Sequence, residues 1–413
     1  MSCRVLIVGG GSELQPQLRR VAAGVETVVL CRASSFPYVR EPQENRAVVM
    51  LNDACTPAWW IGAARAIHAQ WRFEALAAFA DLDQDRAAAI ATDLQLPFHS
   101  PETVQLVQDK VRMRARLRER GVESVPCRAI DSMEALTLFY RETGPPVILK
   151  PSRGWASTGI SVVNSEENLA GAFRRTVQAT PFLVGPSPPM AERCFEGREF
   201  SVEAITHRGV HHVFAVTEKF KDERTKVELG HLVPARITGR EERLLIEHVR
   251  AALTALGVGF GPTHTEVILS SQGPVIVETH LRDGGDEIPR LVEDATGVDM
   301  ADLFLRQVLG ADIGALPEFE SRREGPRYTA GGAIRYIALD CDGILERIGG
   351  WDQVRALPGV RASMQLVPDG TALDGLNSSF ARLGYVRVQA ADAEAALKLA
   401  REAAKGLAVR LRA

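Results

Sequence analysis

Two glutamates flank a turn in the segment from His264 to His280, and their spacing constrains the fold of this chain more than any other feature. Side chains of a β-strand alternate between its two faces, and residues 270–273 have the composition of a hairpin turn. The pattern predicts a hairpin in which Glu266 lies opposite Glu278. His264 then lies opposite His280 on the same face. The other face takes the apolar residues Val267, Leu269, Val275 and Val277.

Like charges that face each other across a hairpin repel. A divalent cation between Glu266 and Glu278 would remove this repulsion. Oxygen ligands suit Mg²⁺, which commonly also binds the phosphates of a substrate. The alternative is a solvated hairpin face with two ordinary acids, and the hairpin alone does not decide between the two interpretations.

The composition is that of an ordinary globular protein. A length of 413 residues predicts about three domains. Hydrophobic residues make up 46% and charged residues 24%, and a net charge of −3 gives no reason to expect a nucleic-acid or membrane partner. The cysteines include no C-x-x-C pair, which argues against a zinc site and a disulfide framework. No secretory leader or long apolar window is present, so we expect a cytoplasmic protein that acts on small molecules.

Three regions follow one another along the chain. Residues 1–100 begin with a buried-strand pattern, a glycine turn at 9–11 and a second strand, as in an α/β domain that helps to form a substrate pocket. The glycine turn lacks the third glycine of a dinucleotide-binding motif. The polar stretch 318–325 is expected to be a linker into a last domain. That domain is expected to have strands at 333–338 and 383–389 and a closing helix at 393–407.

A basic helix is expected to follow Asp109. Its alternate arginines spread around the helix, so each of them is expected on a solvated face. The arginines are Arg112, Arg114, Arg116, Arg118 and Arg120.

A small-residue loop joins the strand that ends at Lys150 to a strand that begins near Ile160. The backbone N–H groups of such a loop can contact phosphates, and Ser157 and Thr158 add hydroxyl donors. Lys150 adds a positive charge at the end of the strand. The lysine precedes the glycines, so the loop is not a Walker A motif. A flexible hairpin loop without function explains this segment equally well.

The segment 192–199 combines an apolar side chain with acids. Phe195 and extended backbone can bracket a purine, and Glu199 can accept hydrogen bonds from ribose hydroxyls. A plain β-hairpin with exposed acids is the alternative.

Taken in chain order, these segments resemble the ATP-grasp superfamily over roughly residues 100–310. The resemblance implies a mainly α/β fold, α+β in parts, with three domains. These are a Rossmann-like pre-ATP-grasp domain (1–100), an ATP-grasp domain (101–320) with a mobile lid at about 122–189, and a carboxylase-like C-terminal lobe (321–413).

The same resemblance implies the ligands of ATP and metal. ATP would bind through Lys110, Lys150, Ser157, Thr158, Gly159, Glu192, Cys194, Phe195 and Glu199. Mg²⁺ or Mn²⁺ would bind through Glu266 and Glu278. His280 stands where the family motif has asparagine, and as a third candidate ligand it is less suited to Mg²⁺ than an amide oxygen.

A finer resemblance rests on residues 230–235 and 333–336, which are similar to bacilysin-type L-amino-acid ligases and related amide ligases. It implies a cytoplasmic ATP-dependent carboxylate-amine ligase that forms an amide or peptide bond through an acyl phosphate and releases ADP and phosphate. Lys150 and Arg282 would act in catalysis. The substrates would contact His231, Arg282, Gly284, Gly285 and Asp286.

Several alternatives stay open at this point. His231 either orients an amino group or only packs, and Arg282 either holds substrate or pairs with Asp283 or Asp286. The whole chain is alternatively a biotin-carboxylase-like enzyme that uses carboxyphosphate, or an ATP-binding protein without turnover. The expected partners are a small-molecule carboxylate and amine, and the family is compatible with a homodimer.

Overall fold

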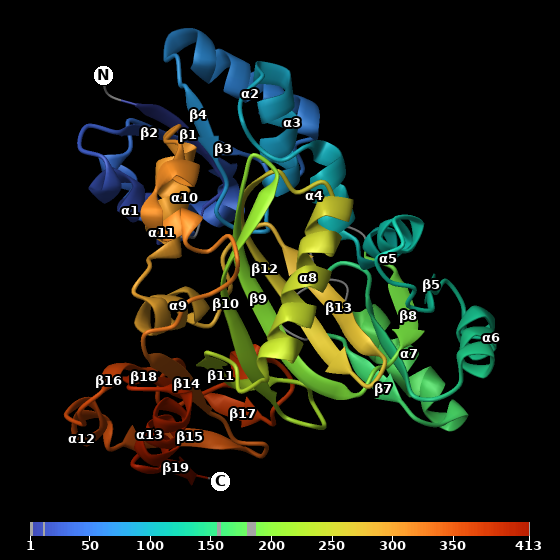
Figure 1. Cartoon of the computed structure of the whole chain (residues 1–413). Coiled ribbons are helices and arrows are strands. Elements are labelled where there is room, and N and C mark those ends of the chain that lie inside the picture. The colour runs from blue at the N-terminus through green and yellow to red at the C-terminus, as the bar shows by residue number, and fades with distance from the viewer. Residues whose placement is uncertain (1–2, 11–12, 155–157, 180–186, 413) are drawn as a thin grey trace.

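The computed structural model describes residues 3–10, 13–154, 158–179 and 187–412 (Figure 1). The first domain contains a parallel sheet with strand order β3-β2-β1-β4, whose apolar strands are covered by helices. Its strands are β1 (Arg4–Val8), β2 (Glu26–Arg32), β3 (Ala47–Leu51) and β4 (Ala75–Ala77), and its helices are α1 (Leu14–Val21), α2 (Pro57–Gln70) and α3 (Gln84–Leu94). The expected α/β domain is therefore present.

The centre of the molecule is an eight-stranded antiparallel sheet with the order β13-β12-β9-β10-β11-β14-β18-β16. Its strands are β9 (Gly197–His207), β10 (Val210–Lys221), β11 (Glu228–Val233), β12 (Phe260–Ser270), β13 (Gly273–His280), β14 (Gly331–Ile337), β16 (Val360–Gln365) and β18 (Gly384–Ala390). Three of these strands come from the C-terminal region. That lobe therefore extends the central sheet instead of standing apart from it.

Helices pack on both faces of the central sheet. Neighbouring residues Val213 and Phe214 of β10 belong to different hydrophobic clusters because successive side chains point to opposite faces. The helix α8 (Gly239–Ala255) covers the first face, and α9 (Ile288–Thr296) and α10 (Met300–Val308) belong to the second cluster. The helices α4 (Pro101–Gln108) and α5 (Lys110–Glu119) lead from the first domain into this one.

A separate sheet of four strands, in the order β5-β8-β6-β7, forms a subdomain with its own hydrophobic core (Figure 1). Its elements are β5 (Cys127–Ala129), α6 (Met133–Thr143), β6 (Val147–Pro151), β7 (Ser161–Val163), α7 (Leu169–Ala179) and β8 (Pro189–Arg193). The sheet runs to Arg193, beyond the boundary at 189 that the sequence suggested for the lid. We call residues 127–193 the lid subdomain.

The C-terminal region adds a small sheet with the order β17-β15-β19. Its elements are β15 (Asp342–Gly349), α12 (Trp351–Arg355), β17 (Ala372–Asp374), α13 (Ala393–Lys405) and β19 (Ala408–Arg412). The expectation of a simple linker at 318–325 is wrong, because Phe319, in the short helix α11 (Pro317–Glu320), is fully buried in the second cluster. Among the described residues, no helix has the length and apolar character needed to cross a membrane.

Candidate active site

The hairpin of β12 and β13 carries the predicted acid pair. Glu266 lies opposite Glu278, and His264 lies opposite His280, as the sequence pattern predicted. A bulge follows Glu266, and Val267 is paired with Ile276. Val267 and Leu269 contribute to the core as expected, and on β13 it is Ile276 that joins this cluster. Val275 is buried outside the cluster, and Val277 is half-buried. The bulge therefore places Ile276 in this core cluster and leaves the acid pair aligned.

Glu278 is held by two cations on the polar face of this hairpin. Lys110 Nζ lies 2.8 Å from Glu278 Oε2 and 3.1 Å from the carbonyl oxygen of Gly154. His280 Nε2 lies 3.2 Å from Glu278 Oε1. Burial alone would raise the pKa of Glu278, but Lys110 and His280 hold it well below its usual range. Glu278 is therefore a carboxylate, as a metal ligand must be.

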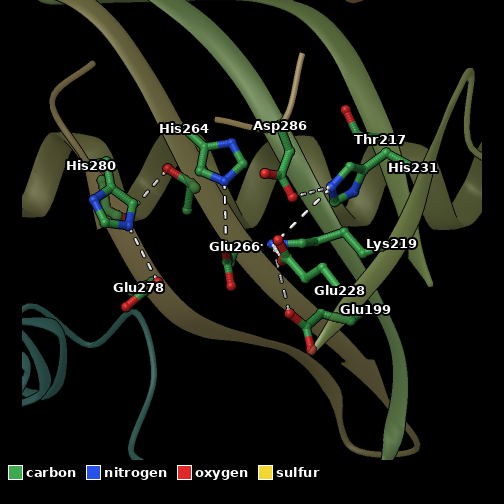
Figure 2. Close-up of polar contacts among 12 residues, drawn as sticks. Glu199, Thr217, Lys219, Glu228, His231, His264, Glu266, Glu278, His280 and Asp286 are labelled. Atoms are coloured by element: carbon green, nitrogen blue, oxygen red, sulfur yellow. Dashed lines mark hydrogen bonds and ion pairs between the residues drawn. The ribbon is translucent and has the colours of Figure 1, made fainter. Parts of the chain in front are cut away.

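Glu266 belongs to a second ion cluster centred on Lys219, which is buried at the end of β10 (Figure 2). The Lys219 ammonium contacts Glu266, lies 2.5 Å from Glu228, and is 4.0 Å from Glu199. Lys221, two residues further along the strand, contacts Glu199. Burial lowers the pKa of Lys219, but the three carboxylates more than reverse this and raise it well above its usual value.

Sequence reasoning missed Lys219, Lys221 and Glu228. The sequence does place Lys219 and Lys221 two residues apart, a spacing that puts both side chains on one face of a strand and could have indicated a cationic pair.

Each histidine of the hairpin has a carboxylate near both of its ring nitrogens. Figure 2 shows the contacts of His264 with Glu266 and of His280 with Glu278. His264 Nδ1 lies 2.9 Å from Glu203, and its Nε2 lies 3.5 Å from Glu266. Burial lowers the pKa of His264, but Glu203 outweighs burial and the pKa rises to about 9. His280 Nδ1 lies 3.1 Å from Asp81, and its pKa is likewise raised. A protonated imidazole has no lone pair for a metal, so this arrangement does not favour His280 as a metal ligand.

Lys150 lies at the end of β6 and is buried against Glu192. Glu192 also accepts a hydrogen bond of 3.0 Å from Arg114. Burial would raise the pKa of Glu192, but Arg114 and Lys150 bring it down to about 2. The expectation that every arginine of α5 is solvated is wrong for Arg114, which is 3% exposed because Glu192 and Glu123 neutralise it.

The proposed adenine and phosphate residues lie at the edges of the lid subdomain. The backbone N–H of Cys194 donates to the carbonyl oxygen of Pro146 at 3.1 Å. The ring of Phe195 is half-buried beneath the guanidinium of Arg193. Thr158 and Gly159 precede β7, and Gly159 adopts a φ of 75° at this turn. Ser157 lies outside the described residues.

Arg282 is fixed next to the hairpin by an acid from the first domain. Its Nε lies 2.7 Å from Asp81, and one Nη donates to the carbonyl oxygen of Asp283 at 2.7 Å. Asp81 thus contacts both Arg282 and His280, and these cations hold the pKa of Asp81 well below its usual range despite burial. The sequence left open an ion pair of Arg282 with Asp283 or Asp286. In the structure, Arg282 pairs with Asp81 instead.

The loop after Arg282 is tied to the C-terminal lobe. Asp286 accepts two hydrogen bonds from the Arg382 guanidinium, at 2.5 and 2.7 Å. His231, which is fully buried, places Nε2 3.1 Å from the same carboxylate. A Cβ atom at Gly284 would lie 2.9 Å from His264 Nδ1, so a larger residue there would displace the histidine. Gly285 has open space around it.

Two cavities border these residues. The first has a volume of about 420 Å³ and is lined by Lys110, Arg153, Gly154, Glu278, His280 and residues of the first domain. The second, of about 960 Å³, is lined by the loop from Arg282 to Glu287 and by residues of α1 and α10. Both volumes suit small molecules.

The donor set at the hairpin fits a hard divalent cation. Carboxylate oxygens of Glu199, Glu228 and Glu266 lie within 4.8 Å of one another. The Lys219 ammonium lies among these three carboxylates, and Glu278 lies opposite Glu266 on the hairpin. Carboxylate oxygens are the ligands that Mg²⁺ prefers. The two positions expected from sequence, Glu266 and Glu278, are thus compatible with Mg²⁺.

Comparisons with known proteins identify two domains in this chain. Residues 143–289 match the ATP-grasp domain family, and residues 335–412 match the L-amino acid ligase C-terminal domain 2. The uncharacterized protein y4rH of Sinorhizobium fredii is 27% identical over 304 residues, which are 72% of this chain and 60% of that protein. The alanine–anticapsin ligase of Bacillus subtilis is 24% identical over 223 residues, which are 49% of this chain and 47% of that ligase.

Among solved structures, the crystal structure of an L-amino acid ligase from Bacillus licheniformis has a TM-score of 0.83 at 20% sequence identity. The match covers 100% of this chain and 99% of that one. The chain spans only 60% and 47% of the length of the two curated relatives. The fold and the paired domain matches define an ATP-grasp protein. The chain also has a region that matches the C-terminal domain 2 of L-amino acid ligases, and its fold is similar to that of the Bacillus licheniformis enzyme.

Proposed function

We propose that the protein is an ATP-dependent carboxylate-amine ligase that joins amino acids, or an amino acid and another amine, in dipeptide or natural-product synthesis. A carboxylate oxygen of one substrate would attack the γ-phosphorus of ATP, and ADP would leave. The amine would then attack the carbonyl carbon of the acyl phosphate, and phosphate would leave. Two cavities at the site offer space for the reacting molecules.

One observation carries the proposal. Asp81 contacts both His280 and Arg282, and His280 in turn contacts Glu278. Arg282 is therefore held next to the candidate metal and phosphate site, while it also lines the second cavity. A guanidinium in that position can hold an acyl phosphate or a carboxylate through two parallel hydrogen bonds.

The other charged residues have roles consistent with this chemistry. Lys110 and Lys150 would neutralise charge on the phosphates of ATP, and Glu199 would accept hydrogen bonds from ribose. Glu266 and Glu278 would hold Mg²⁺, which when bound neutralises phosphate charge. The segment 192–195 would contact adenine mainly through its backbone, because Arg114 and Lys150 already occupy the Glu192 carboxylate.

Phosphate release from ATP and Mg²⁺ tests the proposal. We would supply amino acids singly and in pairs, with bicarbonate as a separate arm, and analyse products by mass spectrometry. Release that requires a particular pair, with a condensed product, would establish the ligase and identify its substrates. Release with bicarbonate alone would identify a carboxylase instead, and ATP binding without any release would favour a non-catalytic protein.

A further inference from the structure

The second cavity, of about 960 Å³, is lined by acids that nearly all have a cation beside them. Asp283 is the exception: within the described part of the chain, its side chain has neither an ion pair nor a hydrogen bond. The other carboxylates of the lining form the pairs Glu13 with Arg40, Asp286 with Arg382, Glu287 with Arg387, Asp299 with Arg290, and Asp302 with Arg306.

One oxygen of the Asp283 carboxylate is open to a ligand. The residue lines the cavity and is half-buried, and its Oδ1 is enclosed without a partner. Oδ2 is not among the enclosed atoms, so it is the oxygen through which Asp283 can meet a ligand. A partly desolvated carboxylate without a partner favours a ligand that brings a positive charge or a hydrogen-bond donor.

The charged residues around Asp283 are engaged elsewhere. Glu203, on β9, lies 2.9 Å from His264, and Asp299 accepts hydrogen bonds from backbone N–H groups at the start of α10. Burial and the charges of Glu203 and Asp299 raise the pKa of Asp283 to about 7. Arg282 and His264 oppose this rise. A carboxyl group with such a pKa can both take up and release a proton near neutral pH.

Asp283 directly follows the arginine that is proposed to hold the acyl phosphate. One Nη of Arg282 donates to the backbone carbonyl oxygen of Asp283 at 2.7 Å, and both residues line the second cavity. An amine that enters this cavity and approaches an acyl phosphate on Arg282 would therefore pass beside Asp283.

We propose that Asp283 binds the ammonium group of the amine substrate in the second cavity and removes one of its protons. This inference rests on the proposed function and adds the residue that prepares the nucleophile. An ammonium group has no lone pair, and most aliphatic amines are protonated near neutral pH. The proton passes to Oδ2, and the nitrogen lone pair then attacks the carbonyl carbon. The bond from that carbon to the phosphate oxygen breaks, and phosphate leaves with its electrons and takes up the second proton that the nitrogen loses.

Hydroxylamine separates this step from the activation of the carboxylate. It is a neutral nucleophile near pH 7 and captures an acyl phosphate as a hydroxamate, so it needs no base to free its lone pair. We would supply ATP, Mg²⁺ and a mixture of the common amino acids over a range of pH, and measure hydroxamate with hydroxylamine present and dipeptides without it. In the parent protein we expect the dipeptide rate to rise as the pH passes about 7 and to level off below the pKa of the amino groups, roughly 8–10.

The variant Asp283→Asn keeps the shape of the side chain but cannot accept the proton. At pH 7 we expect its dipeptide rate to fall at least about 100-fold and its hydroxamate rate to change less than about twofold. The deficit should shrink as the pH approaches the pKa of the amino groups, because a free amine needs no base. Asp342→Asn, an exposed change in the C-terminal region, should alter neither rate.

Two results in Asp283→Asn would overturn the inference: an unchanged dipeptide rate, or an equal loss of both products. The parent profile keeps the test decisive if the variant does not fold. A parent dipeptide rate that rises only through the pKa of the amino groups would show that no base with the pKa of Asp283 acts on the amine. A parent protein that forms neither product would contradict the proposed function itself, and this inference with it.

Discussion

The Lys110 ammonium lies 2.8 Å from Glu278 Oε2, on the same face of the hairpin as Glu266. A proposed phosphate ligand and a proposed metal ligand thus form an ion pair with each other. Binding of Mg²⁺ and ATP would offer each of them a new partner of opposite charge. We therefore expect nucleotide binding to exchange this contact for contacts of Lys110 with phosphate and of Glu278 with Mg²⁺.

Neutralising the acid pair tests these assignments. In a Glu266→Gln/Glu278→Gln variant we expect ATP-dependent phosphate release to fall at least about 100-fold, since charge stabilisation at the phosphoryl group is lost. The control is Glu247→Gln, on the exposed side of α8, which should behave as the parent protein. If the double variant hydrolyses ATP at the normal rate, these carboxylates do not bind the metal.

The lid subdomain should respond to nucleotide as a unit. It has its own sheet and core, and its strands β6 and β8 carry Lys150 and Glu192. Closure over ATP would exclude water that hydrolyses an acyl phosphate. We expect peptides from residues 127–193 to become more protected from amide hydrogen exchange on addition of ATP and Mg²⁺, with α13 as an unaffected reference. Unchanged exchange throughout the lid subdomain would argue against closure.

The hairpin could be predicted because the residues that determine it lie close together in the sequence. Strand alternation and one turn sufficed to place Glu266 opposite Glu278, and the same reasoning located the strands β14 and β18 of the central sheet. The bulge after Glu266 could not be predicted, because it depends on how β12 and β13 pair and twist together.

The partners of the site residues could not be predicted, because they come from distant parts of the chain. Asp81 reaches His280 and Arg282 from the first domain, and no periodicity in either segment indicates this contact. Arg114 appeared to be one of several solvated arginines. It is buried because Glu192 lies opposite it in the fold.

The pKa of Asp283 leads to a prediction on stability. Burial, together with the charges of Glu203 and Asp299, raises the pKa of Asp283 to about 7, whereas Arg282 and His264 oppose the rise. Because the unfolded chain ionises this carboxyl near pH 3.8, the folded state favours its neutral form. The corresponding stability is fully present below pH 3.8 and is lost as the pH rises through about 7.

The variant Asp283→Asn keeps the neutral form at all pH values. We expect it to raise the free energy of unfolding at pH 8 by about 2–4 kcal/mol and to change it little at pH 4, as measured by urea unfolding. The exposed Asp342→Asn serves as the control. A variant that is no more stable than the parent at pH 8 would show that the pKa of Asp283 is not raised in the folded protein.

Arg382 connects the C-terminal lobe to the loop from Arg282 to Glu287, which we call the substrate loop. Its guanidinium donates two hydrogen bonds to Asp286 and lies 3.8 Å above the ring of Tyr336. Lysine retains the charge but cannot form the two parallel hydrogen bonds or stack in the same way. We expect Arg382→Lys to raise the KM for the amino-acid substrates at least about tenfold and to leave the KM for ATP nearly unchanged, as measured by phosphate release. Arg355→Lys, an exposed change in the same lobe, should alter neither constant. An equal rise of both KM values would indicate that Arg382 supports the fold as a whole, whereas a selective rise would show that the C-terminal lobe positions the substrate loop through Asp286.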